Sequence, residues 1–205
     1  MITMHHLRIG RSIFTVWLLE ELGLEYELKE YLRDPDTMRA PPELKNIHPL
    51  GKSPVIEEDG LVLSESGAIT AYLLQKYDRD GKFTPDPNDL PAWAEYSQWL
   101  HYPEGSVFVP LFLKLLSSRA GDAAALLDMF ADPEVKLHFD HITNKLGDNE
   151  FILGDSISGA DFGITYMVGM AERLGLLAPY PKLAAYLARN QARPAFQRAI
   201  ERAVE

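Results

Sequence analysis

Two adjacent residues, Glu65 and Ser66, place an acid and a hydroxyl at the expected start of a helix over residues 67–77. The Ser66 hydroxyl and the first amides of that helix can hold a carboxylate, because a helix N-terminus carries partial positive charge. The Glu65 carboxylate can hold an ammonium group. A ligand that carries both charges on one carbon is the head of an amino acid. The alternative is that Ser66 only caps the helix and that Glu65 is solvated.

A second candidate is the segment Lys52-Ser53-Pro54, which precedes an expected strand over residues 55–57. Proline cannot donate a ladder hydrogen bond, so Pro54 belongs at an edge or at the opening of a strand. If the Ser53–Pro54 bond is cis, the N–H and C=O of Ser53 turn outward and can dock an extended peptide by strand addition. Most X–Pro bonds are trans, so the residues alone do not establish a cis bond.

The stretch LRIGRSIF, residues 7–14, is a third candidate. Apolar residues at positions 1–7 predict a strand, and the run 12–22 predicts a helix that is closed by Gly23. The loop between them holds two arginines and one glycine, and Ser12 follows it directly. A strand that leads into a helix N-terminus is a common place for chemistry on anions.

The elements that must position these residues form two regions. The first region predicts a small mixed sheet covered by helices, in the order strand, helix, strand, helix, strand, strand, helix. Its clearest signals are the apolar–polar alternation of residues 26–31, a short helical segment over 41–45, and a hairpin around Asp59-Gly60. An Asp-, Pro- and Gly-rich linker follows. We expect a first domain over residues 1–79, a linker over 80–91 and a second domain over 92–205.

Every long segment of the second region has helical periodicity, which predicts an all-helical bundle. The expected helices cover residues 92–100, 107–116, 123–146, 161–174 and 182–203. Within this region, Ser158 and Asp161 have the spacing of a capping box, and Ile157 and Phe162 occupy the staple positions around it. We interpret this motif as a folding device.

The composition excludes several classes of function. The net charge of −10 opposes binding to nucleic acid or to an anionic membrane surface. The chain has no cysteine, so disulfides, thiolate metal sites and cysteine nucleophiles are excluded. No apolar run reaches the roughly 20 residues that span a membrane, and the N-terminal residues show no secretory signal pattern. We therefore expect a cytoplasmic protein.

Taken in order and spacing, several motifs carry a family resemblance over the whole chain. The chain resembles the glutathione transferases, most closely a bacterial and fungal branch with the pattern APPELK-x-IHPLGKSP. The motifs are WLLEELGLEYE (17–27), APPELKNIHPLGKSPVI (40–56), LSESGAI (63–69), HYPEGS (101–106), SGAD (158–161) and YPKLAAYLARNQARPAFQRA (180–199). The resemblance implies a thioredoxin-like α/β N-terminal domain, an all-α C-terminal bundle, a homodimer, and glutathione bound against the first domain.

The resemblance also implies roles for individual residues. It assigns Glu65 and Ser66 to the γ-glutamyl head of glutathione, and the backbone of Ser53, before a cis Pro54, to its cysteinyl part. Lys52 falls near the glycine carboxylate, and Arg39 lies where some relatives make a further contact to that carboxylate. The resemblance further implies glutathione as a co-substrate and no metal. The electrophile pocket implied by the family would be walled by the first bundle helices, with candidates Trp99, Tyr102, Val107, Phe108 and Phe112.

The chain departs from the family at the thiolate-stabilising position. Related sequences carry a serine there, four residues before an arginine, and alignment on Trp17 puts Gly10 and Phe14 at these two places. Three interpretations stay open. Ser12 supplies the hydroxyl; or backbone amides near Gly10–Ser12 and the charge of Arg11 stabilise the thiolate; or catalysis is weak or lost.

The sequence thus predicts a glutathione transferase that adds the glutathione thiol to small hydrophobic electrophiles. The alternatives are a non-catalytic protein that binds glutathione or hydrophobic ligands, and a glutathione-dependent peroxidase or reductase. Glu134, His138 and His141 share one helix face at metal-ligand spacing, but we interpret that face as solvated rather than as a metal site.

Overall fold

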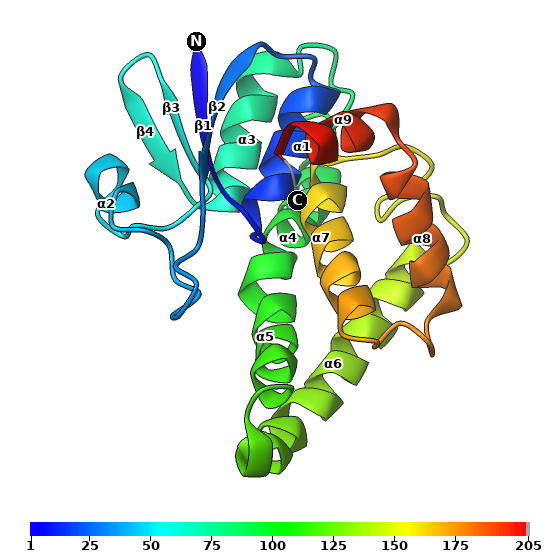
Figure 1. The fold of residues 1–205 in the computed structure, drawn as a ribbon. Coiled ribbons are helices and arrows are strands. Elements are labelled where there is room, and N and C mark those ends of the chain that lie inside the picture. The colour runs from blue at the N-terminus through cyan, green and yellow to red at the C-terminus, as the bar shows by residue number, and fades with distance from the viewer. Residues whose placement is uncertain (204–205) are drawn as a thin grey trace. The chain divides into compact units, whose positions relative to one another are not determined.

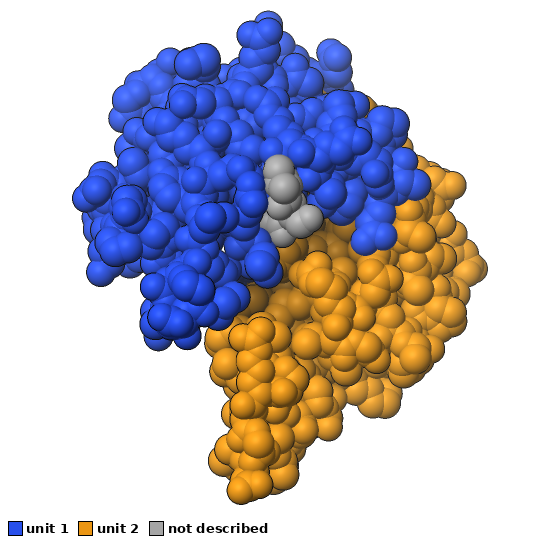
Figure 2. Space-filling view, in the orientation of Figure 1, with its two compact units in different colours: residues 1–80, 191–205 blue, residues 81–190 orange. Residues whose placement is uncertain are grey.

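The structure is a computed structural model that describes residues 1–203. The described chain forms two compact units (Figures 1 and 2): residues 1–80 together with residues 191–203, and residues 81–190. Packing thus groups the last helix with the sheet, whereas the sequence predicts it within the second domain. The domain limits at 79 and 92 stay a prediction. Within the described chain, no helix is both long and apolar enough to cross a membrane.

Unit 1 is built on a four-stranded mixed sheet in the order β2-β1-β3-β4. Its strands are β1 (Ile2–Leu7), β2 (Tyr26–Tyr31), β3 (Val55–Glu58) and β4 (Leu61–Ser64). Strand β2 pairs with β1 in parallel, and β3 is antiparallel to both β1 and β4. The hairpin turns at Asp59-Gly60, as the sequence predicts, with φ of 48° and 85° at these residues.

The helices of unit 1 are α1 (Ser12–Glu21), α2 (Leu44–Ile47), α3 (Ser66–Tyr77) and α9 (Pro194–Ala203). Residues 12–19 of α1 are buried on all sides, because α1 contacts β1, α3 and α9. Apart from Ser12 and Thr15, these buried side chains are apolar, as expected for a helix that is covered on all sides. Trp17 meets Phe196 of α9 edge to face at 5.2 Å, and Arg193 binds both carboxylate oxygens of Glu21 at 2.5 and 3.0 Å. Figure 1 shows α9 (red) beside α1.

Unit 2 is helical. It contains α4 (Leu90–Tyr102), a π-helical turn (Pro103–Val107), α5 (Phe108–Ser117), a 3-10 turn (Gly121–Ala123), α6 (Ala124–Leu146), α7 (Gly159–Arg173) and α8 (Pro181–Gln191). Helices α5 and α6 pack against each other, and α4 packs against α7. The capping box at the start of α7 is confirmed: Asp161 accepts from the backbone N–H and the hydroxyl of Ser158 at 2.8 and 2.9 Å.

The largest differences from the predicted helix limits fall in residues 101–106 and 182–203, and the short helix expected over 41–45 lies at Leu44–Ile47. The segment 182–203 is not one helix, because Pro194 begins a new one; proline lacks the N–H that a continuous helix needs. Conversely, residues 101–106 are helical and join α4 to α5. The wider π turn begins at Pro103, where the missing N–H removes one α-helical bond.

Candidate functional site

Three chain segments that the sequence singles out meet at one end of the sheet of unit 1. His5 of β1 pairs with Val55 of β3, and Val55 pairs with Ser64 of β4. Because β3 is antiparallel to both neighbours, the end of β1, the start of β3 and the end of β4 lie at the same end of the sheet. The loop after Leu7, the Ser53–Pro54 pair and the Glu65–Ser66 pair therefore lie next to one another.

The Ser53–Pro54 peptide bond is cis, which confirms the expectation from the resemblance. The Ser53 side chain is directed into the fold. Its hydroxyl donates to the carbonyl of His5 at 2.8 Å and accepts from the N–H of Leu7 at 3.1 Å. Ser53 thus continues the β1–β3 pairing through its side chain.

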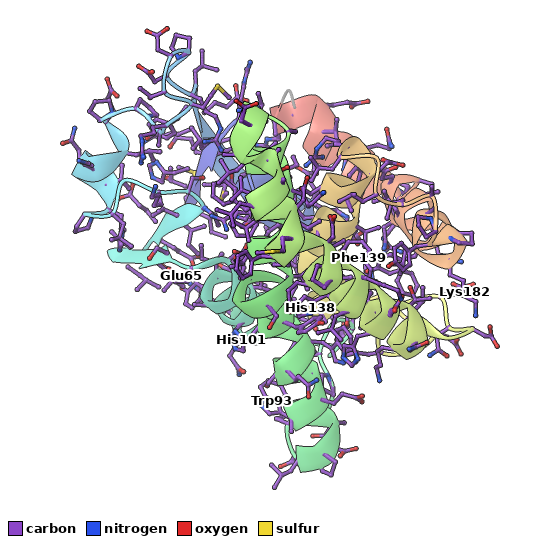
Figure 3. The ribbon with its side chains drawn as sticks, turned by 90° about the horizontal axis from the view of Figure 1, so that it is seen from below. Glu65, Trp93, His101, His138, Phe139 and Lys182 are labelled. Carbon is purple, nitrogen blue, oxygen red and sulfur yellow. The ribbon has the colours of Figure 1, made fainter. Side chains whose placement is uncertain are left out.

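Glu65 occupies the N-cap of α3 with φ of 73° and ψ of 114°, a conformation that non-glycine residues rarely adopt. Figure 3 shows it where β4 passes into α3. Its side chain is exposed, whereas Ser66 is buried. The idea that Ser66 caps the helix is wrong, because Ser66 is already its first residue and Glu65 stands at the cap without a side-chain capping bond. Strained non-glycine residues of this kind concentrate at ligand sites.

Gly10, in the loop after β1, is buried in a space that admits no side chain. A Cβ at this position would lie 2.6 Å from the carbonyl oxygen of Leu7 and 3.2 Å from Nη2 of Arg33. Because the Leu7 oxygen belongs to the backbone, a Cβ at 2.6 Å from it would force the chain to shift. A serine at position 10, the family's usual arrangement, therefore does not fit this loop.

Ser12 begins α1, but its side chain is fully buried. Its oxygen lies 2.9 Å from Nδ1 of His6 and accepts from the N–H of Leu7 at 3.2 Å. The hydroxyl also lies 3.3 Å from the carbonyl oxygen of Leu7. These contacts direct Ser12 into the interior, which counts against a direct contact between its hydroxyl and a bound sulfur atom.

The three basic residues of the predicted site lie at the surface of unit 1. The side chains of Lys52 and Arg39 are exposed, and Arg11 is half-buried at the N-cap of α1. The backbone of Arg39 belongs to a turn in which its carbonyl accepts from the N–H of Asp34 at 2.9 Å. The contacts of Lys52 and Arg39 with a glycine carboxylate stay predictions.

The aromatic residues expected around the electrophile belong to unit 2 and differ in exposure. Trp99 is buried, stacked on His141 at 5.2 Å and edge-on to Tyr102 at 5.1 Å. Phe108 is half-buried and stacks on exposed Phe112 at 5.5 Å. Trp99 is thus part of the packed interior, while Tyr102 and Phe108 keep accessible surface.

Tyr102 makes a polar contact that the sequence analysis did not anticipate. Its hydroxyl lies 2.6 Å from Nδ1 of His138 on α6, and Nε2 of His138 lies 3.6 Å from Glu134. Burial raises the pKa of Tyr102 to about 12 and lowers the pKa of His138. At neutral pH the phenol is therefore protonated and the imidazole neutral, so the phenol can donate to Nδ1 in the tautomer that carries its proton on Nε2.

The three residues at metal-ligand spacing, Glu134, His138 and His141, take part in other contacts. His138 bonds Tyr102, and His141 stacks on Trp99. Among residues 1–203, no group of three or more His, Asp or Glu side chains is arranged to hold a metal ion.

Sequence reasoning missed two residues of the loop region, Arg33 and His6. Arg33 follows β2 and donates to carbonyls of the loop after β1, and His6 holds the hydroxyl of Ser12. Arg33 lies in an undistinguished polar stretch, and no motif marks it. Alternation places adjacent His5 and His6 on opposite faces of a strand, but it does not predict that the structure buries both.

Comparison with known proteins agrees with this geometry. Residues 2–75 match the family of the glutathione S-transferase N-terminal domain, and residues 123–189 match that of the C-terminal domain. Glutathione S-transferase 1 of Saccharomyces cerevisiae is 34% identical over an alignment that covers 91% of this chain and 88% of the yeast protein.

Solved structures show the same relationship. A glutathione S-transferase from Actinobacillus pleuropneumoniae is 38% identical, with a TM-score of 0.88, and the match covers 100% of this chain and 93% of that one. A glutathione transferase family member from Pseudomonas fluorescens, solved with two glutathione molecules bound, is 27% identical, with a TM-score of 0.79 and coverage of 98% and 92%.

The chain has a thioredoxin-like sheet domain followed by a helical domain. A cis-proline and Glu65, in a strained backbone conformation, lie at one end of the sheet, and these features define the class. The chain belongs to the glutathione S-transferase family.

Proposed function

We propose that the protein conjugates the thiol of glutathione to small hydrophobic electrophiles. The observation that carries this proposal is the meeting of three segments at one end of the sheet: the loop 8–11, Ser53–Pro54, and Glu65–Ser66. Glutathione is an extended peptide with an amino-acid head, and each of its parts finds a group of matching charge or hydrogen bonding at this end of the sheet. The Pseudomonas fluorescens relative, whose structure holds glutathione, supports the same ligand.

The γ-glutamyl head is proposed to bind at Glu65 and Ser66. The exposed Glu65 carboxylate is a partner for the ammonium, and the first amides of α3 with the Ser66 hydroxyl are partners for the carboxylate. The backbone of Ser53 pairs with the cysteinyl part by strand addition. Lys52 and Arg39 are the proposed cationic partners of the glycine carboxylate.

The thiolate is proposed to be stabilised by main-chain amides at the start of α1 and by the charge of Arg11. A free thiol of this type has a pKa near 8.5, so donors and a helix N-terminus are needed to ionise it at neutral pH. The buried hydroxyl of Ser12 and the absence of a side chain at Gly10 leave the backbone as the donor that this loop offers.

In the proposed reaction the thiol proton leaves to solvent, the sulfur attacks the electrophilic carbon, and the leaving group departs as an anion. Tyr102 and Phe108, which keep accessible surface, are the proposed contacts of the electrophile. Buried Trp99 would support them from behind through its contact with Tyr102.

A non-catalytic glutathione-binding protein is the second candidate, and the lack of a side-chain hydroxyl at Gly10 with the burial of Ser12 favours it. Two measurements separate the candidates: calorimetric binding of glutathione, and turnover of a chlorodinitrobenzene-type electrophile. Binding with turnover supports the transferase. Binding without turnover supports the second candidate, and turnover of peroxide or disulfide substrates alone would point to a peroxidase or reductase. Without glutathione binding, the proposal fails.

We also propose that two copies of the chain associate through the face of α5 and α6. Large apolar side chains are exposed along both helices: Val109, Phe112, Leu116, Leu126, Met129, Phe130 and Leu137. Large exposed apolar areas on soluble proteins typically mark association surfaces. Light scattering of the unaltered protein and of Phe130→Asp tests this. We expect the unaltered protein to be a dimer and Phe130→Asp to be a monomer. A monomer in both samples would refute the proposed association.

A further inference from the structure

Arg33, two residues beyond β2, binds three carbonyl groups at once. Its Nε donates to the carbonyls of Arg8 at 3.1 Å and Ile9 at 3.2 Å. Its Nη2 donates to the same Ile9 oxygen at 2.9 Å, and Nη1 donates to the carbonyl of Met38 at 3.0 Å. Only the planar fork of a guanidinium offers donors in this arrangement.

Two of the residues held by Arg33 have unusual backbone conformations. Ile9 has φ of 55° and Met38 has φ of 57°. Their side chains are 69% and 40% exposed, so packing of these side chains does not explain the conformations. A β-branched residue with positive φ is a genuine outlier. Such strain persists only where the surroundings impose it, and here both carbonyls are turned toward one guanidinium.

The direction of the Ile9 carbonyl fixes the direction of the next amide. The C=O of Ile9 and the N–H of Gly10 belong to one planar trans peptide, so they point in opposite directions. Arg33 therefore orients the Gly10 N–H away from the guanidinium. A hydrogen bond to the carbonyl also polarises the peptide, which makes its N–H a stronger donor.

We propose that Arg33 is a positioning residue that aims the Gly10 amide at the glutathione sulfur, in place of the side-chain hydroxyl that related sequences carry. The inference rests on the proposed function of the site. It also explains the glycine: a Cβ at position 10 would lie 3.2 Å from Nη2 of Arg33 and 2.6 Å from the Leu7 oxygen. A side chain at position 10 would therefore clash with the loop conformation that Arg33 holds in place.

The test compares Arg33→Lys with the unaltered protein. Lysine keeps the charge but loses the fork, so it cannot hold the carbonyls of Arg8, Ile9 and Met38 together. The pKa of bound glutathione is measured by ultraviolet titration of the thiolate, and kcat and KM are measured across pH. Arg193→Lys is the matched control, because Arg193 makes a bidentate contact with Glu21 at the opposite end of α1.

We expect the thiol pKa in Arg33→Lys to move toward the free value of about 8.5. At neutral pH, kcat should fall by about tenfold or more, because misplacing a reacting group slows the chemical step, while KM for glutathione should change little. Arg193→Lys should leave the thiol pKa in place. Circular dichroism confirms that each variant is folded.

The outcomes separate this inference from the proposed function. If the unaltered protein does not bind glutathione, the proposed function fails and the role of Arg33 fails with it. If the unaltered protein binds glutathione with a lowered thiol pKa and Arg33→Lys keeps that pKa, only the inference is overturned. The same holds if Arg193→Lys shifts the pKa equally, because the effect would then reflect general loosening of the unit.

Discussion

The hydroxyl oxygen of Ser12 lies 2.9 Å from Nδ1 of His6, and both side chains are fully buried in unit 1. The same oxygen accepts from the backbone N–H of Leu7. Ser12 thus ties the first turn of α1 to the end of β1. Its position in the sequence suggests a catalytic hydroxyl, but its contacts are those of a residue that holds the loop together.

This geometry predicts the effect of Ser12→Ala. The variant removes the hydroxyl that contacts the buried Nδ1 of His6, which should lower the free energy of unfolding by about 1–3 kcal/mol, while the N–H of Leu7 keeps its bond to the Ser53 hydroxyl. The thiol pKa of bound glutathione should not change. Urea denaturation measures the first quantity and thiolate titration the second. A stable variant with a raised thiol pKa would restore Ser12 as the direct donor.

Gly10→Ala is expected to destabilise the protein, because the added Cβ would meet the Leu7 oxygen at 2.6 Å. Steric insertion into a packed site typically costs about 1–3 kcal/mol. Gly105→Ala is the matched control, since nothing lies within 4 Å of a Cβ there. Denaturant midpoints compare the two variants. Equal midpoints would mean that the loop relaxes around the new side chain and that the space at Gly10 imposes no constraint.

The sheet and its order of helices are predictable because their signals are local. Alternation gives the strand at residues 26–31, and Asp59-Gly60 gives the hairpin. The cis bond before Pro54 follows only from the resemblance, because the local residues fit either isomer. Arg33 could not be predicted at all. Its role depends on carbonyls of Arg8 and Ile9, about 25 residues earlier in the chain, and carbonyls are present at every position.

The same contrast applies to unit 2. Helical periodicity predicts α6 within one residue of its observed start, because its buried positions recur at helical spacing. Periodicity cannot predict that Tyr102 bonds His138, since this contact depends on how α4 and α6 pack. The contacts of the electrophile depend on side-chain packing in the same way and stay predictions. The homodimer and the cytoplasmic location also stay predictions.

Glu65→Gln should weaken the binding of glutathione by about 10- to 100-fold, because a hydrogen bond to a charged group contributes about 1.5–3 kcal/mol. Calorimetry with glutathione and with an analogue that lacks the α-amino group isolates the contact. The variant should lose affinity for glutathione but not for the analogue. Glu25→Gln, at an exposed position of the same unit, is the control. Equal losses for both ligands would contradict the assignment of Glu65 to the ammonium.

His138 is expected to make the stability of the protein depend on pH. Burial lowers its pKa, and the neighbouring charge of His141 acts in the same direction, whereas Glu134 opposes them. The unfolded chain therefore binds a proton at His138 at a higher pH than the folded chain does. Stability from this group is present above the unfolded pKa of about 6.5 and is lost as pH falls through the lower folded value.

His138→Gln should remove this part of the pH dependence, because glutamine can still accept a hydrogen bond from Tyr102 but does not titrate. Denaturation at a series of pH values from neutral to mildly acidic measures the slope. His101→Gln, at an exposed position on α4 (Figure 3), serves as the control and should keep the slope of the unaltered protein. If His138→Gln keeps that slope as well, proton uptake at His138 does not oppose folding, and the part-buried Tyr102–His138 contact tolerates a charged imidazole.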